Sequence, residues 1–499
     1  MKKSAGIAVG LIVAAGALTT AGAWFTGNQL DGVLRTATEE ANQQMKRALI
    51  GFDGSVTLEL VSLEKNLFTS TAHYRLKAES PSLGKGEENL ELLFVDHIEH
   101  GPLPLSRLKS GKLMPVMVTS NFALEKNEFT EKWFALTKGE SPLKGQASLG
   151  YDRGTTSTIE LLPLDGALDE TSAVKFSGMS IDVVSSAEAE KVRIGGSMAS
   201  LALSVTGENK QPVLMELRGL TLDSDRFKGG SGLYLGSTDV NVDSAALTLA
   251  DQSPWLLKDL NQRDTLEETG SNLVGRGSYD IGMISYNGKD IGGAQVLWSF
   301  NNLDIPALQS LISLYESKFQ SQQAASVDAD ALSEAERVQL LADVDKLLAA
   351  KPHIALDKFL LKTASGESHF ALSLDLNKPE SLDLPTPLLV QQLIGELNAK
   401  LVVSKPMISD VISVQAALNG ETDQVAVAQQ ASMVSEMASG MAVATQLAKL
   451  EGSDIVSTLR YADEQVDFNG QKMSVEQFAS MVMAMAGGLG GGLPGQAAE

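Results

Sequence analysis

Residues 71–78, TAHYRLKA, carry an apolar side chain at every second position: Ala72, Tyr74, Leu76 and Ala78. Successive side chains of a β-strand point to opposite faces of a sheet, so a period of two indicates a strand with one buried and one wet face. The stretch therefore predicts a half-buried strand, and the same pattern recurs around it.

Alternation of this kind continues from about Gly54 to Trp298. The runs that show it include residues 56–60, 90–94, 158–164, 175–184, 192–205, 213–222, 232–242 and 275–286. Asn-Gly in the segments 286–289 (YNGK) and 468–471 (FNGQ) predicts two tight hairpins, because this pair accepts the positive φ angles of a two-residue turn. We expect an antiparallel β-rich domain over residues 51–303.

A short sequence echo accompanies these strands. Residues 178–182 (GMSID) resemble residues 219–223 (GLTLD), and residues 302–305 (NLDI) form a shorter third copy. Each copy opens or closes a strand run, which suggests similar β units added side by side.

Residues 304–486 mix helices with strands. Helical periodicity or capping predicts helices at 308–319, 334–350, 388–393, 406–416, 423–450 and 475–485, and strands at 353–363, 369–376, 397–403, 455–460 and 465–468. The Gly-rich tail, 487–499, is expected to be disordered. The predicted fold class is α+β: an N-terminal transmembrane helix, an extended antiparallel β-rich body, and helices concentrated in the C-terminal half.

The N-terminus reads as a membrane anchor, residues 1–26. After Lys2 and Lys3, residues 4–25 contain no charge, and such a length suffices to cross a bilayer. The lysines place the N-terminus in the cytoplasm and the body beyond the membrane. The alternative is a signal peptide cleaved after Ala23. Residues 27–50 then predict an amphipathic helical stalk.

Composition excludes several classes of partner and chemistry. The formal net charge is −22, which disfavours a nucleic-acid partner. The chain has no cysteine, so thiol nucleophiles, thiolate zinc sites and disulfides are absent.

No motif in the sequence indicates catalysis. His97 and His100 form the densest histidine cluster, but on a strand their odd spacing directs them to opposite faces. Ser197, the nearest approach to a nucleophile elbow, sits inside a β run. We expect no catalytic residue, no cofactor, no metal site and no enzyme.

One candidate surface remains, on the predicted helix 423–450. Met433, Met437, Met441 and Leu447 lie roughly on one face. Methionine side chains pack in cores and also form adaptable contact surfaces, so the stripe is either core or a surface for a lipid or a partner chain.

Several motifs in order resemble the YdgA/YihF family of bacterial envelope proteins. They are residues 22–27 (GAWFTG), 100–105 (HGPLPL), 112–115 (KLMP), 138–142 (KGESP), 459–463 (LRYAD) and 468–474 (FNGQKMS). The resemblance implies a single-pass protein of the Gram-negative inner membrane, with its bulk in the periplasm and a homodimeric state. It favours the retained anchor and supplies no catalytic residue.

These features lead to one functional hypothesis and two alternatives. The leading hypothesis is a membrane-anchored periplasmic structural protein that binds lipid along an apolar β groove. The alternative is an envelope protein-interaction or assembly module that acts as a homodimer. A more remote alternative is an envelope hydrolase.

Overall fold

The computed structural model describes residues 30–48, 54–79, 89–206, 211–250, 252–318, 332–421 and 423–489. They form two compact units: unit 1 lies within Met1–Arg263 and Ile312–Ser333, and unit 2 within Asp264–Leu311 and Glu334–Glu499. The predicted span 4–25, its alternative cleavage site and residues 490–499 of the predicted disordered tail fall outside the described residues. Residues 487–489 of that tail are helical. Among the helices that are described, none is both long and apolar enough to cross a bilayer.

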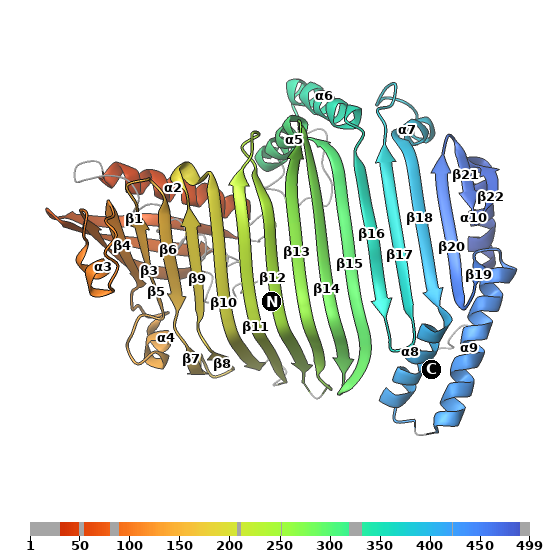
Figure 1. Cartoon of the computed structure of the whole chain (residues 1–499), viewed down its shortest axis with the longest axis horizontal. Helices are drawn as coiled ribbons and strands as arrows, with labels where there is room; N and C mark the ends of the chain where they lie inside the picture. The colour runs from red at the N-terminus through yellow and green to blue at the C-terminus, as the bar shows by residue number, and fades with distance from the viewer. Residues whose placement is uncertain are drawn as a thin grey trace. The chain divides into compact units, whose positions relative to one another are not determined.

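Unit 1 is an antiparallel sheet with one long helix and several short ones (Figure 1). Its elements are α2 (Leu30–Ala48), β1 (Ser55–Lys65), β2 (Thr69–Glu79), β3 (Asn89–His100), α3 (Leu105–Lys109), β4 (Val118–Leu124), α4 (Glu131–Leu136), β5 (Leu143–Leu149), β6 (Thr155–Leu161), β7 (Leu164–Ala167), β8 (Ser172–Phe176), β9 (Met179–Ser185), the 3-10 turn Ala187–Ala189, β10 (Lys191–Thr206), β11 (Pro212–Lys228) and β12 (Tyr234–Leu249). Pairing runs β1–β2–β3–β4–β5–β6–β9–β10–β11–β12.

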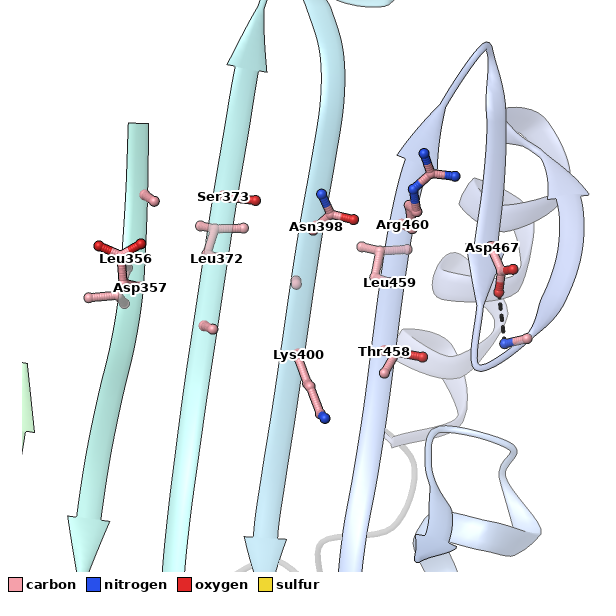
Figure 2. A pocket seen from close by; sticks show the side chains of 14 residues that line it. Leu356, Asp357, Leu372, Ser373, Asn398, Lys400, Thr458, Leu459, Arg460 and Asp467 are labelled. Atoms are coloured by element: carbon pink, nitrogen blue, oxygen red, sulfur yellow. Dashed lines mark hydrogen bonds between the residues drawn. The ribbon is translucent and has the colours of Figure 1, made fainter. Parts of the chain in front are cut away.

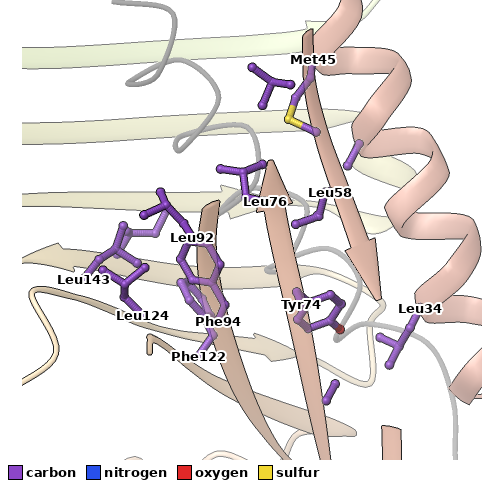
Figure 3. Close-up of a cluster of buried hydrophobic side chains, with 14 of the residues drawn as sticks. Leu34, Met45, Leu58, Tyr74, Leu76, Leu92, Phe94, Phe122, Leu124 and Leu143 are labelled. Carbon is purple, nitrogen blue, oxygen red and sulfur yellow. The ribbon is translucent and has the colours of Figure 1, made fainter. Parts of the chain in front are cut away.

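The core of unit 1 lies between this sheet and α2 (Figure 3). In β2 the burial alternates along the whole strand, with Tyr74 and Leu76 each 1% exposed. Opposite them, Leu34 and Met45 of α2 are fully buried. Asn42 of α2 also donates to and accepts from the backbone of Leu58 in β1, at 2.9 and 2.7 Å. The alternation in residues 71–78 thus predicted both the strand and its buried face correctly.

The predicted stalk differs from the observed structure. Residues 30–48 are helical, as the periodicity indicated, but α2 packs on the sheet and contributes to the core of unit 1. The apolar stripe that suggested an amphipathic stalk is the face that α2 buries. Periodicity reveals such a face without revealing what covers it.

The sequence echo marks left-handed backbone positions. The first residues of its three copies, Gly178, Gly219 and Asn302, have φ of 89°, 67° and 59°. In β11 the less exposed positions are mainly odd-numbered before Gly219 and even-numbered after it. The left-handed residue therefore lies where the strand exchanges its two faces, so the echo records a backbone requirement.

Unit 2 is a second antiparallel array with helices at the strand ends (Figure 1). Its elements are β14 (Asn272–Tyr286), β15 (Lys289–Asp304), α6 (Glu334–Ala349), β16 (His353–Lys362), β17 (Glu367–Leu376), α7 (Thr386–Leu393), β18 (Ile394–Ser404), α8 (Lys405–Leu418), α9 (Gln424–Ala444), β19 (Lys449–Glu451), β20 (Asp454–Ala462), β21 (Gln465–Phe468), β22 (Gln471–Ser474) and α10 (Val475–Leu489). Two further elements, β13 (Trp255–Thr269) and α5 (Ile305–Lys318), contain residues of both units.

Both predicted hairpins are present in unit 2. Asn287 and Gly288 have φ of 53° and 70° between β14 and β15, and Asn469 and Gly470 have φ of 52° and 82° between β21 and β22. These are the positive values that a two-residue primed turn requires.

The division between the units falls within β13, at Arg263/Asp264, and not near residue 303. The long hairpin β14–β15 pairs with β16, so it belongs with the later strands. The change of sequence texture near residue 306 marks the start of a helix. It does not mark the end of a sheet.

Candidate functional site

The methionine stripe lies on α9, on the side of the helix that faces away from the rest of unit 2. Asp423 caps the helix by accepting hydrogen bonds from the backbone of Val425 and Ala426, both at 3.0 Å. Met433, Met437 and Met441 are 70%, 58% and 55% exposed. The core interpretation of the stripe is therefore wrong within this chain, and the stripe is an exposed apolar surface.

Small side chains form the buried side of α9. Val427, Ala431, Ser435 and Ser439 recur every four residues and are at most 5% exposed. They let α9 approach α8, where Glu436 pairs with Lys405 at 2.7 Å. A helix whose small residues lie inside and whose methionines lie outside reverses the usual burial order.

Leu447 does not belong to the stripe. The predicted helix 423–450 ends at Ala444, because Gln446 adopts a φ of 60° and the chain turns into β19. Leu447 lies in that turn, 36% exposed, with its carbonyl accepting a 3.0 Å bond from Asn469.

A second apolar surface covers one face of the unit 2 sheet, and we call it the apolar face. Residues directly opposite each other on antiparallel strands share a face. The rows from β16 through β17 and β18 to β20 are Ile354–Leu374–Leu397–Tyr461, Leu356–Leu372–Ala399–Leu459 and Phe359–Phe370–Leu401–Ser457.

The apolar face is not closed by other described residues. Ile354, Leu401, Phe359 and Leu372 remain 48%, 42%, 39% and 36% exposed. Side chains in a closed hydrophobic core are almost fully buried, as they are in unit 1. These exposed fractions therefore indicate an open surface. Sequence reasoning did not single out these positions; in β16 a bulge between Leu356 and Phe359 moves the apolar positions from even to odd numbers.

Helices border the apolar face. The Tyr461 hydroxyl donates to the Gln391 carbonyl of α7 at 3.3 Å. At the edge, the rings of Phe468 and Phe478, the latter on α10, lie 5.6 Å apart. At the other strand end, Asp410 of α8 accepts hydrogen bonds from the β16–β17 turn. Helices therefore lie at both ends of these strands and at one edge of the apolar face.

The opposite face of the same strands is polar. Arg460 Nε donates to Glu396 Oε1 at 2.8 Å, and this contact, with one from Asn398, lowers the pKa of Glu396. A cavity of about 610 Å³ is lined by polar residues of this face and also by the row Leu356–Leu372–Ala399–Leu459 (Figure 2). Its lining includes Ser373 and Lys400 and contains no histidine, so Ser373 has no imidazole base there. The cavity does not supply the arrangement that a serine hydrolase needs.

The histidine cluster lies in β3, and the expected separation is observed. His97 is exposed on the outer face, and His100 is half-buried on the inner face, 3.0 Å from the Ser70 hydroxyl. Burial lowers the pKa of His100. Across the described residues, no three His, Asp or Glu side chains lie close enough together to hold a metal ion.

An ionisable group that the sequence did not single out is buried in the core of unit 1. Asp96 is fully buried, with Oδ1 accepting from the Ser120 hydroxyl at 2.7 Å and Oδ2 unpartnered. Burial raises its pKa to about 7. The buried hydroxyl of Tyr74 also lacks a partner, and burial and the Asp96 charge raise its pKa. In the sequence, the burial of Asp96 could have been inferred only from its place at an inward position of an alternating apolar run.

Known proteins similar to this chain carry little functional information. A family model described as a bacterial protein of unknown function, DUF945, matches residues 1–476. Protein YdgA of Escherichia coli K12 is 25% identical over 487 residues, covering 95% of this chain and 96% of that protein. The uncharacterised protein YihF of the same strain is 22% identical over 493 residues, covering 95% and 98%.

A third relative covers less of the chain. An uncharacterised protein of Haemophilus influenzae is 27% identical over 161 residues, which is 32% of this chain and 42% of that protein. No solved structure matches. The resemblance inferred from the motifs is confirmed.

Proposed function

This chain belongs to the DUF945 family of bacterial proteins of unknown function, and from that premise we propose that it is a membrane-anchored periplasmic envelope protein that holds lipid acyl chains on the apolar face. The anchor is the predicted span 4–25, in the inner membrane. The observation that carries the proposal is the exposure of apolar side chains from all three rows of the apolar face, above all Ile354, Leu372 and Leu401.

An acyl chain fits this surface better than a polar ligand does. The three rows offer only aliphatic and aromatic groups apart from the Tyr461 hydroxyl and Ser457, and burying apolar area yields roughly 25 cal/mol per Å². A polar ligand placed there would lose its hydrogen bonds to water without replacement. Lipid tails have no such bonds to lose.

Lipid content should depend on the apolar face alone. We expect the Leu372→Asp/Leu401→Asp variant to lose co-purifying lipid, because two carboxylates would sit where the acyl chain lies. Native mass spectrometry after mild detergent extraction measures the bound species. The matched control is Ser373→Asp/Lys400→Asp, which alters the adjoining positions on the polar face and should keep its lipid. Lipid-free native protein, or equal lipid in both variants, would contradict the proposal.

A second candidate function is an assembly module acting as a homodimer through α9. Its support is the exposed stripe of Met433, Met437 and Met441 on a helix whose only charged residue, Glu436, is paired with Lys405. On a chain of net charge −22, an uncharged helix face is where two copies meet with least repulsion.

The dimer hypothesis predicts a shift in assembly state. The variant Met433→Ser/Met437→Ser/Met441→Ser should weaken self-association by roughly tenfold or more, since each buried methionine contributes on the order of 1 kcal/mol. Analytical ultracentrifugation of the detergent-solubilised chain measures this. Val338→Ser on α6, where valine is 59% exposed, is the control and should leave the dissociation constant unchanged. A monomeric native protein would rule out a dimer interface at α9.

A further inference from the structure

One end of the unit 1 sheet displays large apolar side chains to solvent. The β1–β2 turn and the β3–β4 connection meet there, since the His100 amide donates to the Phe68 carbonyl at 2.8 Å. Together they form what we call the apolar tip. Its side chains and exposures are Leu67 85%, Phe68 71%, Leu103 51%, Leu105 67%, Leu113 69% and Met114 76%.

Hydrogen bonds fix the conformation of the apolar tip. Arg107, only 8% exposed, donates to the Ser148 hydroxyl at 3.0 Å and to the Met114 carbonyl at 3.3 Å. Glu99 accepts from the backbone and hydroxyl of Ser106, at 3.0 and 2.6 Å. The Val116 amide donates to the Pro102 carbonyl at 3.1 Å. These bonds fix the segment in a conformation that exposes its leucine side chains. Exposing them to water costs free energy, and a monomer in solution gains nothing in return.

The apolar tip differs from the rest of the protein in the sign of its charge. Residues 101–116 contain three basic residues and no acidic one, in a chain of net charge −22. Lys109 and Lys112 are exposed, and the Lys112 ammonium donates to the neutral Gln146 side chain at 3.2 Å. At the other end of β4, residues 125–132 contain three glutamates and two lysines, so that segment is net acidic.

The entry of the chain into α2 lies toward the same end. In Figure 3, Leu34 lies on the Tyr74 side of the core and Met45 on the Leu76 side. Because β2 starts at Thr69, next to the β1–β2 turn, the N-terminal half of α2 points toward the apolar tip. The predicted span 4–25 precedes Leu30, so an anchored chain would bring this end of unit 1 nearest to the bilayer.

We propose that the apolar tip is a second membrane contact, which inserts its leucine and phenylalanine side chains among the headgroups of an anionic bilayer while Lys109 and Lys112 bind lipid phosphates. Apolar residues that enter the interface beside lysines are the combination that binds anionic membranes. The inference rests on the proposed anchor and is independent of lipid on the apolar face. It gives unit 1 a fixed orientation: one end on the membrane and the α4 end away from it.

The absence of cysteine allows a clean test in the full chain. A single environment-sensitive fluorophore is attached at Leu113→Cys or, as the matched control, at Phe129→Cys, where phenylalanine is 41% exposed at the opposite end. Each protein is reconstituted in vesicles of phosphatidylethanolamine and phosphatidylglycerol that carry nitroxide-labelled lipid. The label at position 113 should shift to the blue and be quenched, and the label at position 129 should not.

Charge reversal provides the second arm. Lys109→Glu/Lys112→Glu should lower the ratio of lipid-contacting to free label by about tenfold or more, and vesicles of phosphatidylcholine alone should have a similar effect. Equal quenching at the two label positions overturns the proposal. A blue shift without lipid quenching also overturns it and identifies a protein contact instead. Quenching that survives both charge tests overturns the role of anionic lipid. None of these results alters the co-purification test of the apolar face.

Discussion

Replacing Asp96 by asparagine is expected to stabilise unit 1 at pH 8 and to remove much of its pH dependence. Native Asp96 is ionised at that pH inside an apolar core, where Oδ2 has no partner. The amide of the Asp96→Asn variant carries no charge, and its oxygen can still accept the 2.7 Å bond from Ser120. The substitution therefore removes the burial of a charge and keeps the hydrogen bond.

The direction with pH follows from the raised pKa. The carboxyl titrates at about 7 in the folded chain, against 3.8 as its ordinary value, so between these values the folded state binds the extra proton. The free energy of unfolding of the native protein should fall as pH rises from about 4 to 7 and then level off. The shift corresponds to about 4 kcal/mol as an upper bound, at 1.36 kcal/mol per pKa unit.

Thermal unfolding followed by circular dichroism at pH 5 and pH 8 measures the effect, with hydrogen exchange assigning the transition to unit 1. Asp182→Asn is the control, because Asp182 is an exposed acceptor for Thr158 on β6. The control should unfold like the native protein at both pH values. An Asp96→Asn variant that is less stable than the native protein at pH 8 would show that the carboxylate is solvated or paired.

Phe122→Ala should be the most damaging single truncation in unit 1, at about 3–5 kcal/mol. Phe122 is 1% exposed and lies directly opposite Gly145 in the β4–β5 pair. Its ring occupies the space of the missing side chain, since a Cβ on Gly145 would lie 2.2 Å from the ring's Cζ. Gly145→Val should in turn cost about 1–3 kcal/mol through overpacking.

A double-mutant cycle tests whether the two residues share one volume. With Phe122→Ala in place, Gly145→Val should cost little or restore some stability, because the valine fills part of the cavity. Urea unfolding of the four proteins gives the coupling energy. Additive effects would show that the ring and the glycine do not depend on each other. Thr158→Val, on the outer face of β6, is a control that should shift the midpoint little.

Local elements were predictable where their determinants are local. Asn287-Gly288 and Asn469-Gly470 each define a hairpin through backbone angles alone. The strand at 71–78 shows its buried face because one period of two runs through it unbroken. In β16, the first strand of the apolar face, that signal is interrupted at the bulge after Leu356, because the bulge shifts the apolar positions from even to odd numbers.

Sequence alone determined the type and approximate position of most strands and helices, the absence of thiol chemistry, the family and the stripe on α9. What covers each apolar pattern was decided only by the tertiary structure. α2 and α9 both present apolar residues at helical spacing, yet α2 buries Leu34 and Met45 whereas α9 exposes Met433 and Met437. Amphipathicity is a property of one element, whereas burial depends on which other element lies against it. That is set by contacts between residues far apart in the chain, such as Asn42 with Leu58 or Lys405 with Glu436.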